Sequence, residues 1–237
     1  MKLVVLAAGY ATRLYPLTQD RPKHLLEVGG RTILDRVLDA AAPIGFDGVV
    51  VVTNSKFADR FREWGQGRND VIVVDDGTST EETRLGAIGD LDLVVSGQRI
   101  EEDLVVIAGD NLFSEPLTGF PPRRDGPVIG VYDVGDLAQI HKYNAIETDG
   151  EGRITFFEEK PEHPRSTIIG IALYFYPSSA LSLLRQYLAE GNNPDQPGRL
   201  VQWLYPRVPF YTWRVPGRWY DIGSHETLAE AEEAFAE

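Results

Sequence analysis

Two cations, Arg13 and Lys23, lie in a short stretch near the start of the chain that has little room for ordinary helix. The strand-like run Lys2–Ala7 precedes them and breaks into a glycine-bearing turn. Pro16 and Pro22 then restrict the backbone, which fixes where the two cations point. A glycine turn after a strand can bind phosphate through its backbone N–H groups. The stretch therefore predicts a site for a phosphorylated polyanion.

The turn differs from the two best-known phosphate-binding loops. A dinucleotide fold needs G-x-G-x-x-G leading directly into a helix, but here Gly9 is followed by Tyr10, Ala11 and Thr12. The Walker A pattern, G-x-x-x-x-G-K-[ST], is also absent from the sequence. What remains is G-x-x-T-R-L-x-P-L-T, followed by a Pro-Lys pair.

Composition makes this loop stand out. The 237 residues include 23 Lys and Arg against 36 Asp and Glu, a formal net charge of −13, and no cysteine. So acidic a chain repels nucleic acid and anionic membranes. The lack of cysteine excludes disulfides, thiolate ligands and cysteine nucleophiles. No apolar run approaches the roughly 20 residues that span a bilayer, and no signal-peptide pattern opens the chain. We expect a cytoplasmic protein that binds neither nucleic acid nor membrane.

The first half of the sequence alternates strand-like and helix-like segments, which predicts a doubly wound α/β fold with a mostly parallel sheet. About 24 residues of loop precede the first helix, whereas such loops usually have 2–6, and so long a loop is usually functional. The expected strands are Lys2–Ala7, Gly48–Thr53, Asp70–Val74, Leu104–Ala108 and Pro127–Tyr132, and the expected helices are Thr32–Ala42, Lys56–Gly65 and about Thr83–Gln98.

After about residue 126 the pattern becomes mixed, with strands joined by polar turns. The expected strands are Ile140–Thr148, residues 151–161, Ile168–Tyr176 and residues 208–216; the expected helices are Ser178–Glu190 and Glu226–Ala236, with a loop over Gly191–Gly198. We see neither a linker nor an internal repeat. We therefore expect one domain, 1–237, with about 1–125 for one ligand and about 126–237 for another.

The stretch LAAGYATRLYPLTQDRPKHLL closely resembles the signature of nucleotidylyltransferases that activate sugar 1-phosphates, L-A-A-G-x-G-T-R-L-x-P-L-T-x-x-x-P-K-x-L-L. The glucose-1-phosphate thymidylyltransferases are its best-known members. The resemblance implies the Rossmann-like mixed sheet of nucleotide-diphospho-sugar transferases. The nucleotide would be bound by the first half and the acceptor by the second. One residue departs from the signature, because Ala11 stands where the family has glycine. The implied nucleotide-binding residues in this loop are Leu6, Ala7, Ala8, Gly9, Ala11 and Thr12.

Asp110 ends a buried strand in VVIAGDNLF, at the usual ligand edge of an open α/β sheet. A carboxylate there suits a hard cation such as Mg²⁺. The family has G-D-N at this point, so the resemblance implies Asp110 as a magnesium ligand. It likewise implies Asp221, in GRWYDIGSHETL, as the second carboxylate. Ser224, just after it, is expected to cap the last helix.

Further matches lie on the base and acceptor sides. The family's E-K-P, with Glu on sugar hydroxyls and Lys on the sugar phosphate, corresponds to Glu159 and Lys160. Gly86 matches the glycine segment that passes over the nucleobase, although the glutamine that commonly reads the base is absent. Asn144 stands in the sugar-contacting segment where the family has glycine, and Ala172 also replaces an expected glycine.

The implied reaction joins a sugar 1-phosphate to a nucleoside triphosphate, with dTTP or UTP favoured, and releases pyrophosphate. Arg13 would clamp the leaving phosphates, Lys23 would lie at the α-phosphate and Lys160 would hold the acceptor phosphate. Mg²⁺ is the expected cofactor. The four histidines fall in polar, turn-rich stretches, and none is expected to be catalytic.

Other readings stay open at this point. One is a cytidylyl- or other nucleotidylyltransferase acting on phosphocholine or a polyol phosphate. Another is a nucleotide-sugar-dependent glycosyltransferase, although those usually carry a D-x-D motif where this chain has G-D-N. A third is a non-catalytic nucleotide sensor, which should have lost one of the key charged residues. The base, the acceptor and any homo-oligomeric state are not fixed by the sequence.

Overall fold

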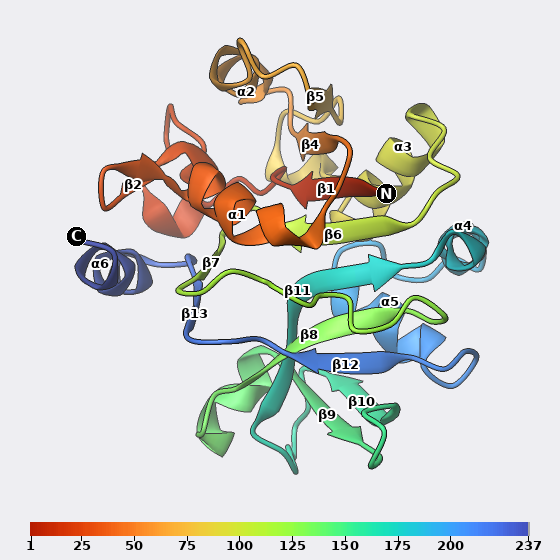
Figure 1. Cartoon of the computed structure of the whole chain (residues 1–237). Coiled ribbons are helices and arrows are strands. Elements are labelled where there is room, and N and C mark those ends of the chain that lie inside the picture. Colours follow the sequence, from red (N-terminus) through yellow and green to blue (C-terminus); the bar gives the residue numbers. More distant parts are fainter. Residues whose placement is uncertain (237) are drawn as a thin grey trace. The chain divides into compact units, whose positions relative to one another are not determined.

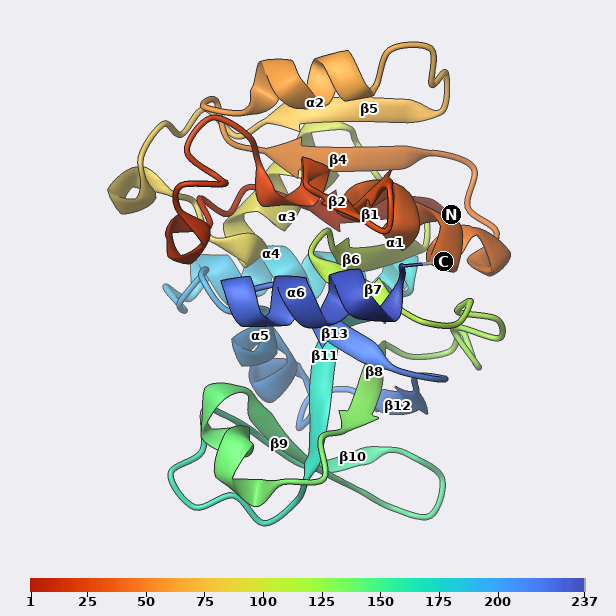
Figure 2. The same ribbon diagram turned by 90° about the vertical axis from the view of Figure 1, so that its left-hand side faces the viewer.

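The valine-rich runs near the start of the chain form parallel strands in the computed structural model, which describes residues 1–236. Strand β1 (Lys2–Leu6) pairs with β4 (Val49–Thr53), and β4 pairs with β5 (Val71–Asp75), both in parallel. Every residue of β4 is buried, as expected for a β-branched run inside a parallel sheet. Strand β5 is the edge and leaves Ile72 half-exposed. Figure 2 shows the three strands side by side.

Two helices of this region form close to where the sequence predicts them. Helix α1 (Ile33–Ala41) begins after Thr32, whose hydroxyl accepts a hydrogen bond from the Asp35 N–H as an N-cap. Helix α2 (Ala58–Trp64) buries Phe61 and lies against β5. The long predicted loop between β1 and α1 is built from short pieces: η1 (Thr12–Leu14), η2 (Lys23–Leu25), β2 (Glu27–Val28) and β3 (Arg31–Thr32), and another 3₁₀ turn, η3 (Ala42–Ile44), follows α1.

The chain divides into two compact units that are not contiguous in sequence. The first comprises Met1–Leu85, Ile107–Gly119 and Pro216–Glu237, and the second comprises Gly86–Val106 and Phe120–Val215. The C-terminal segment thus joins the first unit. There β13 (Trp219–Asp221) pairs antiparallel with β7 (Asn111–Phe113), and α6 (His225–Ala234) follows. These two short strands were not predicted from the sequence.

The second unit contains a mixed set of strands (Figure 1). Strand β8 (Val128–Asp133) pairs antiparallel with β11 (Ile168–Tyr176) and parallel with β12 (Tyr211–Arg214). Strand β6 (Leu104–Ala108) contributes its first three residues to this unit and its last two to the first unit. The change to a mixed pattern after residue 126 is therefore confirmed.

One predicted strand of this unit is partly wrong. Residues Leu137–Lys142 form a 3₁₀ helix, η5, rather than the start of a strand, because Asp136 caps the turn by accepting a hydrogen bond from the Ala138 N–H. The strand itself, β9 (Asn144–Thr148), is shorter and pairs antiparallel with β10 (Ile154–Glu159).

Three helices of the second unit pack on one another, namely α3 (Ala87–Gly97), α4 (Leu181–Ala189) and α5 (Pro197–Leu204). Helix α3 starts later than predicted. Gly86, directly before it, has a φ of +82°, which is not helical, and residues Glu81–Thr83 form the separate turn η4. The turn η6 (Ser178–Ala180) leads into α4. Helix α5 was missed, since its Pro-Gly start looks like loop. None of the helices in residues 1–236 is long and apolar enough to cross a membrane.

The start of α6 confirms Ser224 as an N-cap. Its hydroxyl accepts a hydrogen bond from the Thr227 N–H, and the Thr227 hydroxyl accepts one from the Ser224 N–H, which completes a capping box. We predict that Ser224→Ala lowers the free energy of unfolding by about 1 kcal/mol. Urea denaturation checks this, with Ser178→Ala as the control because no side-chain cap is made at η6. Equal losses in the two variants would contradict the capping role.

Candidate active site

The loop after β1 is held on both sides and open in the middle. The Ala7 N–H donates to the Val52 carbonyl (2.9 Å), and Asn54 Nδ2 donates to the Ala8 carbonyl (2.8 Å). The Tyr10 hydroxyl, which is buried, makes a hydrogen bond of 3.1 Å with the Thr78 hydroxyl. Gly9 between them is exposed, and a Cβ added there would meet nothing within 4 Å. The loop therefore presents open backbone, as a phosphate-binding turn requires.

Ala11 adopts the conformation for which the family uses glycine. Its φ of 50° and ψ of 42° lie in the left-handed region, which costs a residue with a Cβ about 1–2 kcal/mol. The Ala11 carbonyl accepts two hydrogen bonds, from the Leu14 N–H (3.0 Å) and from the buried Thr18 hydroxyl (2.7 Å). These bonds hold the strained residue and give the T-R-L-x-P-L-T pattern a structural reason.

Lys23, the first residue of η2, and Asp110, in the turn between β6 and β7, form an ion pair. The Lys23 ammonium donates to Asp110 Oδ2 and to the Ile222 carbonyl (3.3 Å), and the two paired side chains are only 14% and 17% exposed. The other carboxylate oxygen of Asp110 accepts from Asn111 Nδ2 (3.0 Å). Asn111, 4% exposed, is in turn fixed by the Trp219 indole N–H (2.8 Å).

Asp221 reaches the same place through strand pairing. Residue 221 lies opposite Asn111 in the β13–β7 register, and the Ile222 N–H donates to the Asp110 carbonyl (3.1 Å). The two carboxylates that the sequence singled out, far apart in the chain, are therefore neighbours. Arg13 lies exposed on η1, and its positive charge acts on Asp221. The first unit thus gathers Arg13, Lys23, Asp110 and Asp221.

The two carboxylates have opposite pKa shifts. Burial would raise the pKa of Asp110, but the charge and hydrogen bond of Lys23, with help from Asn111, outweigh it and lower this pKa. Burial, together with the negative charge of Asp110, raises the pKa of Asp221 to about 6, although Lys23 and Arg13 oppose the shift. The site therefore concentrates more negative charge than Lys23 neutralises.

This pair of carboxylates fits Mg²⁺. Burial and, after it, the negative charge of Asp110 raise the pKa of Asp221, and a cation between the two carboxylates would offset both effects. No group of three His, Cys, Asp or Glu side chains in residues 1–236 could hold a metal by itself. Mg²⁺ is usually bound by one or two carboxylates together with waters and substrate phosphates rather than by a full protein cage. Asp110 and Asp221 supply such a partial donor set.

His24 is buried, contrary to the polar setting expected from the sequence. It is 2% exposed, its ring lies 5.9 Å from that of Phe61, and its Cδ2 would be 3.0 Å from a Cβ on Gly109. Burial, reinforced by the charge of Lys23, lowers its pKa to about 3, so the ring is neutral at pH 7. The neutral ring of His24 thus packs in the core beside Phe61 and Gly109, directly after Lys23 in the chain, with its Nδ1 buried and without a hydrogen-bond partner among the residues that the structure describes. Nothing in the sequence pattern pointed to this role.

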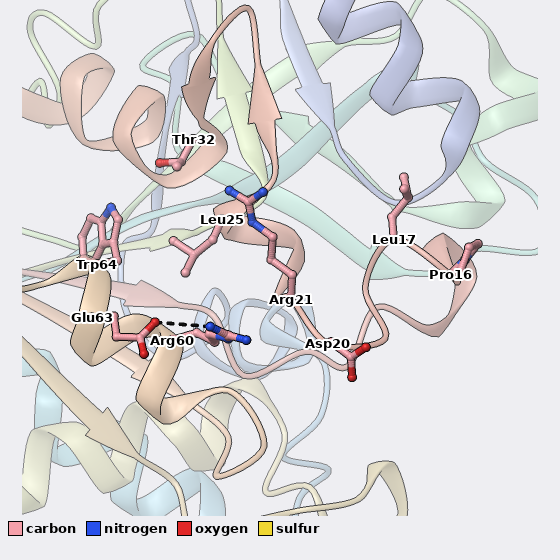
Figure 3. Close-up of a pocket in the computed structure, with 9 residues that line it drawn as sticks. All are labelled: Pro16, Leu17, Asp20, Arg21, Leu25, Thr32, Arg60, Glu63 and Trp64. Atoms are coloured by element: carbon pink, nitrogen blue, oxygen red, sulfur yellow. Dashed lines mark hydrogen bonds and ion pairs between the residues drawn. The ribbon is translucent and has the colours of Figure 1, made fainter.

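A cavity of about 530 Å³ lies beside the same loop, between residues 16–25 and α2 (Figure 3). Leu25 and Trp64 line it, and its two arginines are each near a carboxylate: Arg60 to Glu63 at 3.4 Å, and Arg21 to Glu27 at 3.5 Å. Its lining contains neither Lys23 nor the two site aspartates, and its charges are balanced. It is therefore a separate feature of the loop and singles out no class of ligand.

The predicted acceptor residues lie in the second unit, at the end of the β9–β10 hairpin. Glu159 ends β10, and its carboxylate lies against Gly198 in the first turn of α5, where any Cβ would collide with it. Burial raises the pKa of Glu159. Lys160 is exposed and has a left-handed φ of 52°.

Two residues of the same unit that were predicted to contact the acceptor or the base are packed inside the protein. Asn144 is buried, and its carboxamide bonds the backbone of Gly170. Gly86 is also buried, and a Cβ there would lie 2.6 Å from the Asp195 Cα and 2.7 Å from the Pro194 carbonyl oxygen. Close packing against Pro194 and Asp195 is therefore enough to explain why this residue is glycine, and a contact with a nucleobase is not needed to explain it.

Comparison with known proteins identifies the class. A family model described as nucleotidyl transferase matches residues 2–237, and the chain belongs to that family. It is a nucleotidyltransferase. It is 31% identical over 180 residues to the UTP–glucose-1-phosphate uridylyltransferase AglF of Haloferax volcanii, covering 74% of this chain and 72% of the relative. It is 28% identical over 240 residues to a glucose-1-phosphate thymidylyltransferase of Mycolicibacterium smegmatis, covering 98% and 81%.

Some curated relatives are considerably longer, since the matched region spans only 53% and 59% of two of them. Among solved structures, a candidate glucose-1-phosphate thymidylyltransferase from Bacillus anthracis, crystallised with sucrose, has a TM-score of 0.81 at 22% identity and covers 100% of this chain and 96% of its own. This likeness confirms the predicted α/β fold with its mostly parallel, mixed sheet.

We predict that Ala11→Gly is as stable as the natural chain or up to about 1 kcal/mol more stable, because glycine relieves the left-handed strain but adds unfolded-state entropy. Ala8→Gly, in the same loop at negative φ, should lose stability by about 0.5–1 kcal/mol. Urea unfolding of both variants decides. A loss in Ala11→Gly as large as in Ala8→Gly would contradict the strain.

We also predict a pH effect from His24. Its pKa of about 3 in the folded chain lies below the ordinary 6.5, so the unfolded chain binds more protons between these values and stability falls as the pH drops below about 6.5. His24→Gln should flatten this decline by up to about 1.4 kcal/mol per pH unit. Denaturation from pH 7 to pH 4 measures it. The exposed His141→Gln is the control, and an unchanged slope in His24→Gln would refute the burial of a neutral ring.

Proposed function

We propose that this nucleotidyltransferase transfers a nucleotidyl group from a nucleoside triphosphate, with dTTP or UTP favoured, to a sugar 1-phosphate. The products are a nucleoside diphosphate sugar and pyrophosphate. The observation that carries the proposal is the largely buried Lys23–Asp110 pair beside the open glycine loop, with Asp221 next to it. The names of the uridylyl and thymidylyl relatives support the choice of substrates.

The chemistry is a direct displacement. A phosphate oxygen of the acceptor forms a bond to the α-phosphorus, the bond from that phosphorus to the β-phosphate oxygen breaks, and pyrophosphate leaves with the electron pair. The acceptor is already anionic, so no covalent enzyme intermediate or general base is required. The difficulty is that two polyanions must meet, so positioning and fixed cations supply most of the catalysis.

Three cations have separate tasks in this proposal. Arg13, exposed on η1, clamps the leaving phosphates with its planar guanidinium. Lys23 lies at the α-phosphate, and its pairing with Asp110 fixes the ammonium before the substrate arrives. Lys160 holds the acceptor phosphate, and Glu159 accepts hydrogen bonds from the sugar hydroxyls. The open backbone of the loop, Leu6 to Thr12, receives the triphosphate.

The proposed cofactor is Mg²⁺ on Asp110 and Asp221. When bound, it neutralises the triphosphate and makes pyrophosphate a better leaving group. Asp221 must be ionised to act as a ligand. Burial and the charge of Asp110 raise its pKa to about 6, and a bound cation would lower this pKa and favour the ionised carboxylate. We further propose that the protein works in the cytoplasm, consistent with its lack of cysteine.

A second class of acceptor is kept in the proposal. Ala172, on the acceptor side, stands where the family has glycine, and this favours a non-sugar phosphate such as phosphocholine or a polyol phosphate as the second candidate. Pyrophosphate release should be measured with Mg²⁺ for dTTP, UTP, CTP, ATP and GTP against sugar 1-phosphates and these other phosphates. Turnover with CTP and phosphocholine alone would replace the sugar, and no turnover anywhere would refute the transferase proposal.

We predict that Lys23→Ala and Asp110→Asn each lower kcat by about 10²–10³, because each removes one preorganised contact to the reacting phosphates or their cation. Steady-state pyrophosphate release measures this at saturating substrate. Arg21→Ala removes a cation from the same stretch that faces the other cavity, so it should retain kcat within about threefold. Circular dichroism and thermal melts must show folded protein. Wild-type turnover in a folded Lys23→Ala or Asp110→Asn variant would overturn the assignment.

A further inference from the structure

Asn144, at the start of β9, uses its whole side-chain amide to bind one glycine. Its Nδ2 donates to the Gly170 carbonyl at 2.9 Å, and its Oδ1 accepts from the Gly170 N–H at 2.6 Å. The residue is 7% exposed. A carboxamide that both donates to and accepts from one residue reproduces the hydrogen bonds of a neighbouring strand. Asn144 therefore fastens β9 to β11 through its side chain.

Side chains crowd Gly170 from several sides. A Cβ there would collide with the Ile129 Cδ1 and would lie 2.9 Å from the Ile146 Cδ1 and 3.3 Å from the Asn144 Oδ1, so the backbone at this point leaves no room for a side chain beside the amide. The pairing of β11 with β8 also shifts register between Gly170 and Tyr174. The Asn144 amide thus satisfies backbone groups of β11 at the point where its regular pairing with β8 becomes irregular.

The residue opposite Asn144 is Glu159. The β9–β10 register pairs these two residues directly, and the Lys160 N–H donates to the Tyr143 carbonyl at 2.8 Å. Lys160 is therefore held by a backbone hydrogen bond to Tyr143, directly before β9. Glu159 lies opposite Asn144 as a non-hydrogen-bonded pair of the antiparallel ladder, and its N–H donates to Gln202 Oε1 at 3.1 Å. Figure 2 shows this hairpin beside β11.

Lys160 needs such support. Its φ of 52° is left-handed, a conformation that costs a lysine of order 1–2 kcal/mol and persists only where the surroundings fix it. Lys160 directly follows the last residue of β10, so this turn ends the strand. If the start of β9 could shift relative to β11, the end of β10 would shift with it.

We propose that Asn144 is a positioning residue that holds Glu159 and Lys160 in place for the acceptor by fastening the hairpin to Gly170. The inference deepens the proposed function and rests on its assignment of the acceptor to Glu159 and Lys160. It replaces a direct contact between Asn144 and the acceptor, because the carboxamide is already engaged at both ends. A glycine at this position, as in the family pattern, would leave the hairpin without this fastening.

The test compares Asn144→Asp and Asn144→Gly with a matched control. Asp keeps the oxygen that accepts from Gly170 but sets a second oxygen against the Gly170 carbonyl, whereas Gly removes both bonds. Thr212→Val is the control, since the Thr212 hydroxyl donates to the Gly152 carbonyl at 3.1 Å elsewhere in the same unit. Each variant is measured for the KM of both substrates, for kcat, and for hydrogen exchange at the Lys160 amide.

We expect both Asn144 variants to speed exchange at the Lys160 amide by at least about tenfold and Thr212→Val to leave it unchanged. The KM for the acceptor phosphate should rise about 10-fold to 100-fold in the Asn144 variants. The KM for the nucleoside triphosphate should stay within about twofold, a split that general loss of stability would not produce. In a Lys160→Ala background, Asn144→Asp should cause little further change, because the two act as a unit.

The possible failures are distinguishable. Unchanged exchange at the Lys160 amide in both Asn144 variants overturns the positioning role, whatever the kinetics. An additive rise in acceptor KM in the double variant also overturns it and indicates a direct contact by Asn144. If Lys160→Ala leaves the acceptor KM unchanged, the acceptor assignment in the proposed function fails, and the exchange data still decide whether Asn144 fastens the hairpin.

Discussion

The ion pair between Lys23 and Asp110 is the constraint on which the first unit depends. Bringing a lysine and a carboxylate out of water is costly, and the pair is tolerated only because further hydrogen bonds satisfy it. The Ile222 carbonyl, Asn111 and, through Asn111, Trp219 supply them. Removing either partner leaves an unpaired charge, a loss typically of about 3–5 kcal/mol when fully buried. The same pair therefore serves the fold and, in the proposed function, holds the Lys23 ammonium in place for the triphosphate.

The loop after β1 contains a strained residue, which its neighbours hold in place. Ala11 is left-handed although it carries a methyl group, and Thr18 and Leu14 fix its carbonyl. Tyr10 and Asn54 anchor the loop to the segments that follow β5 and β4, through bonds to Thr78 and to the Ala8 carbonyl respectively. A rigid loop costs a polyanionic substrate less ordering when it binds, which is the general advantage of a preorganised site.

In the second unit, Glu159 and Lys160 lie at the end of a short two-stranded hairpin. An isolated two-stranded hairpin is marginally stable. Here β10 is supported by α5, whose first turn accommodates the Glu159 carboxylate at Gly198, and β9 is fastened to β11 by Asn144. Departures from the family pattern need not mean altered substrate contacts. At position 144 the difference lies in how the backbone is held.

Local features were set by the sequence itself. The valine-rich strands, α1, α2, the Ser224 cap and the proline-bounded cation loop follow from periodicity and backbone restriction, which depend on near neighbours in the chain. Only the tertiary structure decided that Asp221 meets Asp110 through the β13–β7 pairing, that His24 is buried beside Phe61, and that the Asn144 amide bonds Gly170. These contacts join segments distant in sequence. They depend on strand register and side-chain packing, which a one-dimensional pattern does not encode.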